Sequence, residues 1–261
     1  MYPPVFDEED SVVTYRAHPL VQGFPGKSAS HGAFGWSSVW LLRATDRTVL
    51  VETGPPSYIP LLTAGLQRHG LRREDVTDVL LTHAHWDHLS NIMMFPRARI
   101  WIGAEELAWA RSLPADAPFF SPLHVSELHH RGSGTGLVTE GEEILPGIHA
   151  LATPGHTPGH IAYLVYADPE PLIFAGDAVK NVYELATGIV DSTLDAELSR
   201  QSIDRLRVTM REAGAVLVPG HDVVLHDRDG EVVRAFPQQG QIGFFASVDG
   251  GEEDRSISAT P

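Results

Sequence analysis

Thr82-His-Ala-His-Trp-Asp-His88 is the stretch that decides the fold of this 261-residue chain. Four of its side chains are good ligands for a divalent cation, and the apolar run 76–81 before it is typical of a buried strand. Imidazole and carboxylate groups suit zinc and its chemical neighbours. Four such groups in six residues exceed the needs of one tetrahedral ion with an open position. The heptad therefore predicts two metals side by side.

Composition and charge narrow the class of protein. The hydrophobic content of 43% and the charged content of 20% are ordinary for a globular protein. Nineteen basic and 34 acidic residues give a formal charge of −15, which disfavours nucleic acid and anionic membrane as partners. Bound metal would reverse that sign locally, so an anionic small-molecule substrate is compatible. The absence of cysteine excludes disulfides, thiolate ligands and cysteine nucleophiles.

The sequence indicates where the protein resides and how it is organised. Its start has neither the basic nor the apolar region of a signal peptide, and no apolar run reaches the about 18 residues of a membrane helix. We therefore expect a cytoplasmic protein. We also expect a single domain over residues 1–261, with mobile ends at 1–10 and 246–261, because those ends are acidic or rich in Gly, Ser and Glu.

Strand and helix patterns alternate between these ends, which favours sheet layers covered by helices. Prolines and glycines interrupt residues 112–136, and this predicts a long irregular loop. Ser57 is expected to cap the first helix. The expected strands are 38–43, 47–52, 76–81, 99–102, 148–152, 161–166, 172–175 and 215–219, and the expected helices are 58–69, 104–111 and 194–212.

Three further candidate ligands stand at strand ends. His156, Asp177 and His221 each follow a glycine just after a predicted strand. Glycine permits a tight turn there, and ligands at the ends of several strands can converge on one rim of a sheet. The predicted ligand set divides into His83, His85 and His156 for one metal, Asp87, His88 and His221 for the second, and Asp177 as a bridge between the two.

These motifs resemble, in this order, the metallo-β-lactamase superfamily. The resemblance rests on the heptad, on Gly155-His-Thr-Pro-Gly-His160, on Gly-Asp177 and on Pro-Gly-His221, and it spans roughly residues 35–225. It implies an α/β fold, a four-layer αββα sandwich with the two-metal site along one edge of two sheets. Family patterns usually show Asp-Thr-Gly before the first helix, and here Glu52-Thr-Gly54 stands in that place.

Details of the sequence narrow the subtype. The lack of cysteine and of a signal peptide disfavours the commonest β-lactamases, and the acidic charge disfavours the nuclease members. The short stretch after His221 leaves no room for the helical domain of glyoxalase II proteins or for a fused flavodoxin domain. What remains resembles compact dimetal hydrolases that open lactones, the N-acyl-homoserine lactonases among them.

That resemblance implies two zinc ions per chain, with iron or manganese as alternatives, and a dimetal-bound hydroxide that attacks a lactone or ester carbonyl. Asp87 would also relay a proton to the leaving alkoxide. In those lactonases a tyrosine three residues after the bridging aspartate holds the substrate carbonyl. Lys180 stands there in this chain, and Tyr183 follows three residues later. We expect Lys180 to stabilise an oxyanion or Tyr183 to replace the phenol. The alternative is a solvated Lys180 and a packed Tyr183.

Neighbouring side chains complete the expected site. His160 is expected to orient a ligand through a hydrogen bond, and Trp86 to pack in the core. Phe119, Phe120 and Leu123 in the irregular stretch would lie beside the pocket and suit an acyl or ring substituent.

Other functions stay open at this point. One is thioester hydrolysis of the glyoxalase II kind, and another is oxygenation of a sulfur substrate by a mononuclear iron on the same fold. A noncatalytic binding protein is disfavoured because the ligand set is intact. The sequence names neither the substrate nor the oligomeric state, and a homodimer is compatible with it.

Overall fold

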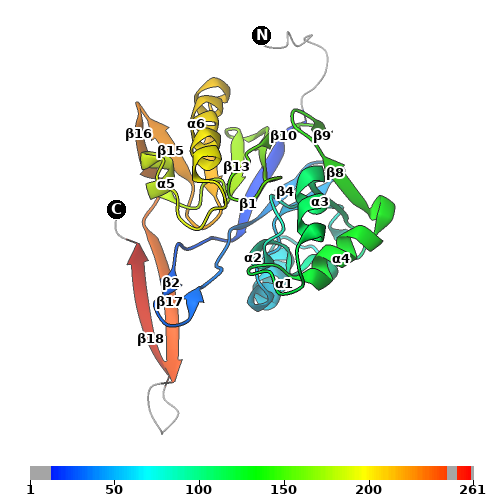
Figure 1. The fold of residues 1–261 in the computed structure, drawn as a ribbon, viewed down its shortest axis with the longest axis horizontal. Coiled ribbons are helices and arrows are strands. Elements are labelled where there is room, and N and C mark those ends of the chain that lie inside the picture. The colour runs from blue at the N-terminus through cyan, green and yellow to red at the C-terminus, as the bar shows by residue number, and fades with distance from the viewer. Residues whose placement is uncertain (1–12, 246–251, 260–261) are drawn as a thin grey trace.

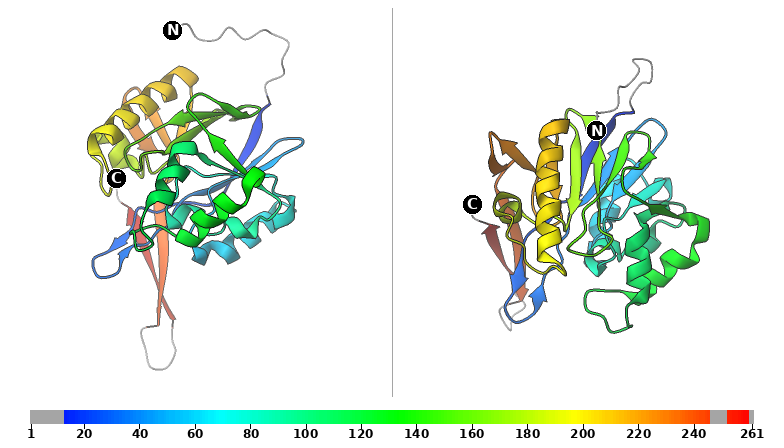
Figure 2. Two further views of the ribbon diagram at one scale, coloured as in Figure 1. Left: turned by 45° about the vertical axis from the view of Figure 1, so that its right-hand side comes forward. Right: turned by 45° about the horizontal axis from the view of Figure 1, so that its top comes forward.

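The computed structural model describes residues 13–245 and 252–259, and it contains two seven-stranded mixed sheets with helices outside them (Figure 1). The first sheet has the order β12-β1-β4-β5-β6-β7-β8 and the second the order β16-β15-β14-β13-β11-β10-β9. Figure 2 shows α6 on the outer side of one sheet and α3 and α4 on the outer side of the other. The predicted αββα sandwich is confirmed.

The strands of the first sheet are β1 (Tyr15–Val21), β4 (Val39–Arg43), β5 (Thr48–Val51), β6 (Asp78–Leu80), β7 (Arg99–Gly103), β8 (Thr135–Val138) and β12 (Ala167–Asp168). Those of the second sheet are β9 (Glu143–Leu145), β10 (Ile148–Ala152), β11 (Ile161–Val165), β13 (Leu172–Gly176), β14 (Val216–Pro219), β15 (Leu225–Arg228) and β16 (Glu231–Arg234). Two hairpins stand apart, β2 (Lys27–Ser28) with β3 (Gly32–Ala33) and β17 (Gln238–Phe245) with β18 (Glu252–Ala259).

The α-helices are α1 (Ile59–Arg68), α2 (Trp86–Leu89), α3 (Ala104–Ser112), α4 (Pro122–His130), α5 (Val182–Thr187) and α6 (Ala196–Ala213). Short 3-10 turns are η1 (Pro56–Tyr58), η2 (Arg73–Asp75), η3 (Ile92–Met94) and η4 (Gly132–Gly134). The long helix α6 begins where the Asp195 carboxylate accepts two backbone N–H groups, and it ends at Gly214 in the left-handed conformation. No helix in residues 13–245 or 252–259 is long and apolar enough to cross a membrane.

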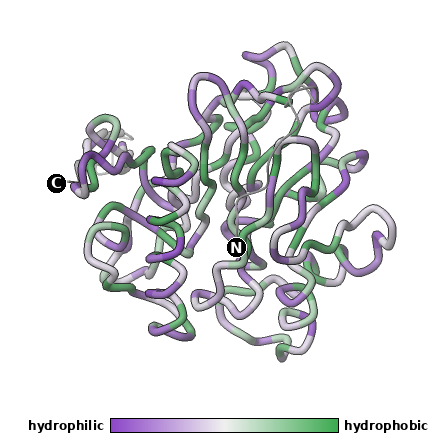
Figure 3. Tube along the Cα trace, turned by 90° about the horizontal axis from the view of Figure 1, so that it is seen from above, coloured by the Kyte–Doolittle hydropathy of each residue, from purple (hydrophilic) through white to green (hydrophobic). Residues whose placement is uncertain are grey.

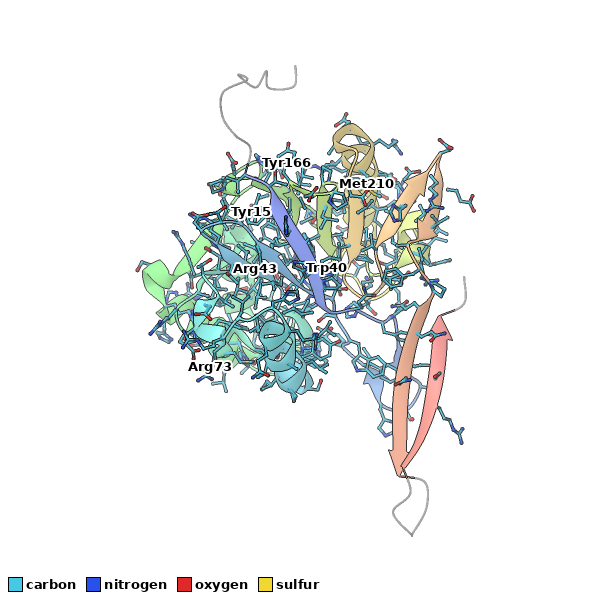
Figure 4. All side chains as sticks on the ribbon, turned by 180° about the vertical axis from the view of Figure 1, so that it is seen from behind. Tyr15, Trp40, Arg43, Arg73, Tyr166 and Met210 are labelled. Atoms are coloured by element: carbon cyan, nitrogen blue, oxygen red, sulfur yellow. The ribbon has the colours of Figure 1, made fainter. Side chains whose placement is uncertain are left out.

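Strand β4 shows how sequence alternation builds the layers. Trp40 and Leu42 point into the apolar core between the two sheets, whereas Val39 and Leu41 point into the core under α1, α3 and α4. Successive side chains leave a strand on opposite sides, and each side of this strand faces one of the two cores, so both of its faces are buried. A third core joins the second sheet to α5 and α6, where Met210 packs. Figure 3 shows hydrophobic residues along the central strands, and Figure 4 shows Trp40 and Met210 on their separate elements.

Most of the expected elements are confirmed, but the irregular loop 112–136 is wrong in part. Residues 122–130 form α4, and η4 and the start of β8 follow it. Pro122 occupies the first helical turn, where its missing N–H costs nothing, and Val125 and Leu128 are buried on one face. The expected helix cap is also wrong, because Ser57 lies inside η1 and caps nothing there.

Part of the C-terminal stretch 246–261 is a strand. Residues 252–259 form strand β18, which pairs with β17 in an antiparallel ribbon that extends away from the two sheets (Figures 1 and 4). Residues 1–12, 246–251 and 260–261 lie outside the described residues, and the expected mobility of the two ends stays a prediction.

The core between the sheets generates a test of stability. Leu42 has no exposed surface and lies between the sheets, so Leu42→Ala should lower the free energy of unfolding by about 2–5 kcal/mol. Leu137, in β8 of the same sheet, is 56% exposed, and Leu137→Ala is the matched control. Urea unfolding of both variants measures the difference, and equal losses would contradict the assignment of Leu42 to this core.

Candidate metal centre

The ends of parallel strands bring the candidate ligands to one edge of the sandwich. In the first sheet β5, β6 and β7 are parallel, and the heptad follows β6. In the second sheet β13 and β14 are parallel, with Asp177 directly after β13 and His221 just after β14. The connection from β10 to β11 adds His156. The carboxyl ends of parallel strands lie at the same edge of a sheet, so the two sheets present their ligand segments together.

His83, His85 and His156 form the first group. The Nδ1 atom of His85 lies 3.0 Å from Nε2 of His83 and 2.9 Å from Nε2 of His156. Burial lowers the pKa of all three, to about 4 for His85, and the charges of neighbouring histidines act in the same direction. The rings are therefore neutral at physiological pH. Three neutral imidazoles with converging nitrogens are the donor set of a zinc-type cation.

Asp87, His88 and His221 form the second group, in which candidate ligand atoms lie within 4.8 Å of one another. The Oδ2 atom of Asp87 lies 3.5 Å from Nε2 of His221 and 3.9 Å from Nε2 of His88. Burial opposes a charge on these two histidines, but the Asp177 and Asp87 carboxylates outweigh it and raise the pKa of both. The same negative charges favour a divalent cation.

Asp177 lies between the two groups. Its Oδ2 is 3.4 Å from Nε2 of His156, and its Oδ1 is 3.3 Å from Nε2 of His88 and 3.2 Å from Nε2 of His221. Burial opposes ionisation of this carboxyl group, yet the charges of His221 and His88 hold its pKa well below the usual range. Each oxygen of the ionised carboxylate therefore faces a different group.

Buried polar atoms test whether these residues fit a pair of cations. Asp177 Oδ1 and both ring nitrogens of His88 are buried without a hydrogen-bond partner among the described residues. Buried polar groups in proteins are nearly always hydrogen-bonded or bound to an ion. The chemistry of the donors and their lack of hydrogen bonds agree, so the seven residues fit two divalent cations.

Glu52 lies behind His88. Its Oε1 accepts a hydrogen bond from the backbone N–H of Thr82 at 3.0 Å and lies 3.6 Å from Nδ1 of His88. Its backbone has a φ of +65°, which is strained for a residue with a side chain. Thr53 next to it donates from its backbone and its hydroxyl to the carbonyl of His88. The sequence shows that Glu52 replaces the aspartate of the family pattern, but it does not show the contact between Glu52 and His88.

His160 and Trp86 differ from their expected places. The Nδ1 atom of His160 is 2.8 Å from the hydroxyl of Thr153, and its ring centroid is 5.0 Å from that of His83. The hydrogen bond of its ring thus joins it to Thr153, and no predicted ligand in the described part of the chain receives one from it. Trp86 is half-buried against Gly35, where a Cβ would lie 2.4 Å from its ring. The expected core position of Trp86 is wrong.

Lys180 and Tyr183 occupy different environments. The Nζ atom of Lys180 is 3.0 Å from Oε1 of the buried Glu184, and its side chain is only 13% exposed. Burial is the main cause that lowers the pKa of His85 and His156, and the charge of Lys180 acts in the same direction. Tyr183 lies in the first turn of α5, the helix that also carries Glu184, and is 54% exposed. The alternative of a solvated Lys180 and a packed Tyr183 is therefore wrong.

The segment before α4 lies beside the first group, as expected. The ring centroids of Phe119 and Phe120 are 5.9 and 5.0 Å from that of His85, and an isolated β-bridge joins His85 to Phe120. Phe119 is 58% exposed and Leu123 is 82% exposed. An apolar surface thus borders the histidines on this side.

Comparison with known proteins agrees with this geometry. An N-acyl homoserine lactonase of a Bacillus species is 25% identical over 212 residues, covering 71% of this chain and 81% of the relative. Metallo-beta-lactamase domain-containing protein 1 of Xenopus laevis is 27% identical over 208 residues, covering 79% of each chain. The AiiA protein of Bacillus thuringiensis, solved with N-decanoyl-L-homoserine bound, shares the fold at a TM-score of 0.64 and 21% identity, with 81% and 94% of the two chains covered.

A match to a family model shows which family the chain belongs to, and the pairwise similarities alone do not show it. The model described as the metallo-beta-lactamase superfamily matches residues 34–221, which include most strands of both sheets and all seven candidate ligands. This chain belongs to the metallo-beta-lactamase superfamily.

Proposed function

We propose that this protein is a metal-dependent hydrolase that opens a lactone or a related ester of a small molecule. The observation that carries the proposal is the carboxylate of Asp177, whose two oxygens face two separate groups of histidines. A pair of cations bound there would polarise a carbonyl oxygen and supply a nucleophile from water at neutral pH. Imidazole and carboxylate donors without thiolate suit zinc, with iron or manganese as alternatives.

The roles of the seven residues follow from their positions. His83, His85 and His156 would hold one cation, Asp87, His88 and His221 the other, and Asp177 both. Asp87 is in addition partly exposed, and its carboxylate would accept the proton lost by the attacking water and pass it to the leaving alkoxide.

Lys180 is the residue that we propose for stabilising the developing negative charge of the carbonyl oxygen. Its ammonium group is held by Glu184 and is largely desolvated, which strengthens its field. Tyr183, exposed in the first turn of α5, offers a phenol as the alternative donor.

The substrate class rests on the surface of the site and on the relatives. Phe119 exposes an apolar side chain near His85 and suits an acyl or ring substituent. The Bacillus relative is a lactonase, and the AiiA structure holds an N-acyl homoserine. Both support a lactone, and at 21–25% identity they leave the ring and acyl group open.

The central experiment is a substrate panel on the metal-loaded protein. Lactones, thioesters and phosphodiesters are offered to the zinc and iron forms, and hydrolysis of lactones with two metals per chain is the expected result. Preference for thioesters would favour a glyoxalase II-like activity. If the protein binds one iron per chain and consumes oxygen with a sulfur substrate, its reaction is oxygenation and not hydrolysis.

Removing the bridging carboxylate should disrupt both cation sites. Asp177→Asn is expected to lower bound zinc below two ions per chain and kcat/KM by roughly 10³-fold, since several kcal/mol of charge stabilisation are lost. His85→Ala should act in the same direction. Elemental analysis and steady-state kinetics measure both effects. The exposed Asp116→Asn is the matched control, and normal zinc content in Asp177→Asn would remove this residue from the ligand set.

The proposed role of Lys180 is separable from metal binding. Lys180→Met should reduce kcat by about 10²–10³-fold, the usual effect of losing one oxyanion donor, and leave the zinc content unchanged. Lys27→Met is the control, because Lys27 is the other lysine of the sequence and is exposed. If Lys180→Met turns over at the normal rate, the role passes to Tyr183, whose Tyr183→Phe variant then shows the loss.

A further inference from the structure

Glu106 is a buried carboxylate that the proposed chemistry does not use. It lies in the first turn of α3 and has no exposed surface. Its Oε1 accepts a hydrogen bond from the backbone N–H of Ala84 at 2.9 Å, and its Oε2 accepts one from the backbone N–H of Gly159 at 3.2 Å. One side chain thus joins the segment that follows β6 of the first sheet to the segment between β10 and β11 of the second.

Both joined segments carry ligands of the same group. Ala84 lies between His83 and His85, and Gly159 is three residues after His156. The two segments are also linked where they meet the strands, since the N–H of Ile161 donates to the carbonyl of Thr82 at 3.0 Å. Glu106 adds a link nearer the histidines, and its partners are the amides beside them.

Close packing fixes the segment of His156 against α3. A Cβ on Gly159 would lie 2.0 Å from the backbone nitrogen of Glu106, and one on Gly103 would lie 2.4 Å from the carbonyl oxygen of Gly159. On its other side the segment meets α6, where a Cβ on Gly155 would lie 2.3 Å from the nitrogen of Ser199. The His156 segment is therefore held between helices of the two outer layers.

The chemistry of the link requires a carboxylate. Both partners of Glu106 are N–H donors, and a carboxylate offers two accepting oxygens, whereas a glutamine would turn an NH₂ group toward one of them. Burial raises the pKa of Glu106 to about 7, against the effect of Thr157 and of the two amides. The two hydrogen bonds to the ligand segments offset part of the cost of burying this ionisable group.

We propose that Glu106 is a positioning residue for the three-histidine group: by accepting hydrogen bonds from both ligand segments, it fixes the distance between His85 and His156 and thereby sets the affinity of this group for its cation. The inference rests on the proposed function only in taking these three histidines as ligands. Partners that orient metal ligands from behind typically change metal affinity by roughly 10- to 100-fold when they are removed.

The test is titration of the metal-free protein with Zn²⁺ and with Co²⁺, followed by calorimetry and by visible absorption. His156→Ala first identifies the binding step and the Co²⁺ absorption that belong to the three-histidine group. Glu106→Gln should weaken that step by roughly 10- to 100-fold and alter that absorption, while the other step changes less than twofold. Glu105→Gln, which makes the same change at the exposed neighbour on the same helical turn, should leave both steps unchanged.

Two further variants keep the inference open to refutation. Glu106→Asp keeps the charge but is one methylene shorter, so it should lose affinity in the same step. Adding Glu106→Gln to His156→Ala should have no further effect on the remaining step. Unchanged binding in Glu106→Gln, equal weakening of both steps, or loss of the folded state in both Glu106 variants would overturn the positioning role. If the wild type binds two cations but hydrolyses nothing, the proposed function fails and the role of Glu106 stands.

Discussion

A buried negative charge shared between two sets of imidazoles is the constraint on which the rest of this structure depends. The Asp177 carboxylate leaves β13 at the edge of one sheet and meets His88 from the other sheet and His156 and His221 from its own. Such a charge is stable away from water only when positive partners surround it. The two sheets must therefore meet at this edge in one arrangement, and the apolar core between them holds that arrangement.

The sequence predicted the parts of the site that depend on local pattern. The heptad follows a short apolar run, and His156, Asp177 and His221 each follow a glycine just after such a run, so strand ends and ligands could be identified together. That was sufficient for the layered fold and for the seven side chains that the structure brings together. Lys180 and Glu184 are four residues apart at the start of α5, and this spacing could have indicated their ion pair.

Other features could not be predicted, because they arise from contacts between distant segments. The bonds from Glu106 span 22 and 53 residues of sequence, and the contact of Glu52 with His88 spans a strand, a helix and the heptad. The sequence does not predict helix α4, because prolines such as those in its region usually break a helix. A proline in the first turn of a helix, such as Pro122, does not break it. Strand β18 lies in a segment of polar composition, and it pairs with the distant strand β17 along its whole length.

Because the donors from residue 83 to residue 221 come from both halves of the sandwich, the centre exists only in the completed tertiary structure. The chain must close large loops before any of these contacts forms, a topology that slows folding. Ions captured by such an assembly bind the native state and not the unfolded chain, so they add to thermodynamic stability in proportion to the logarithm of their concentration. Metal supply would then govern how long the protein survives in the cell as well as whether it is active.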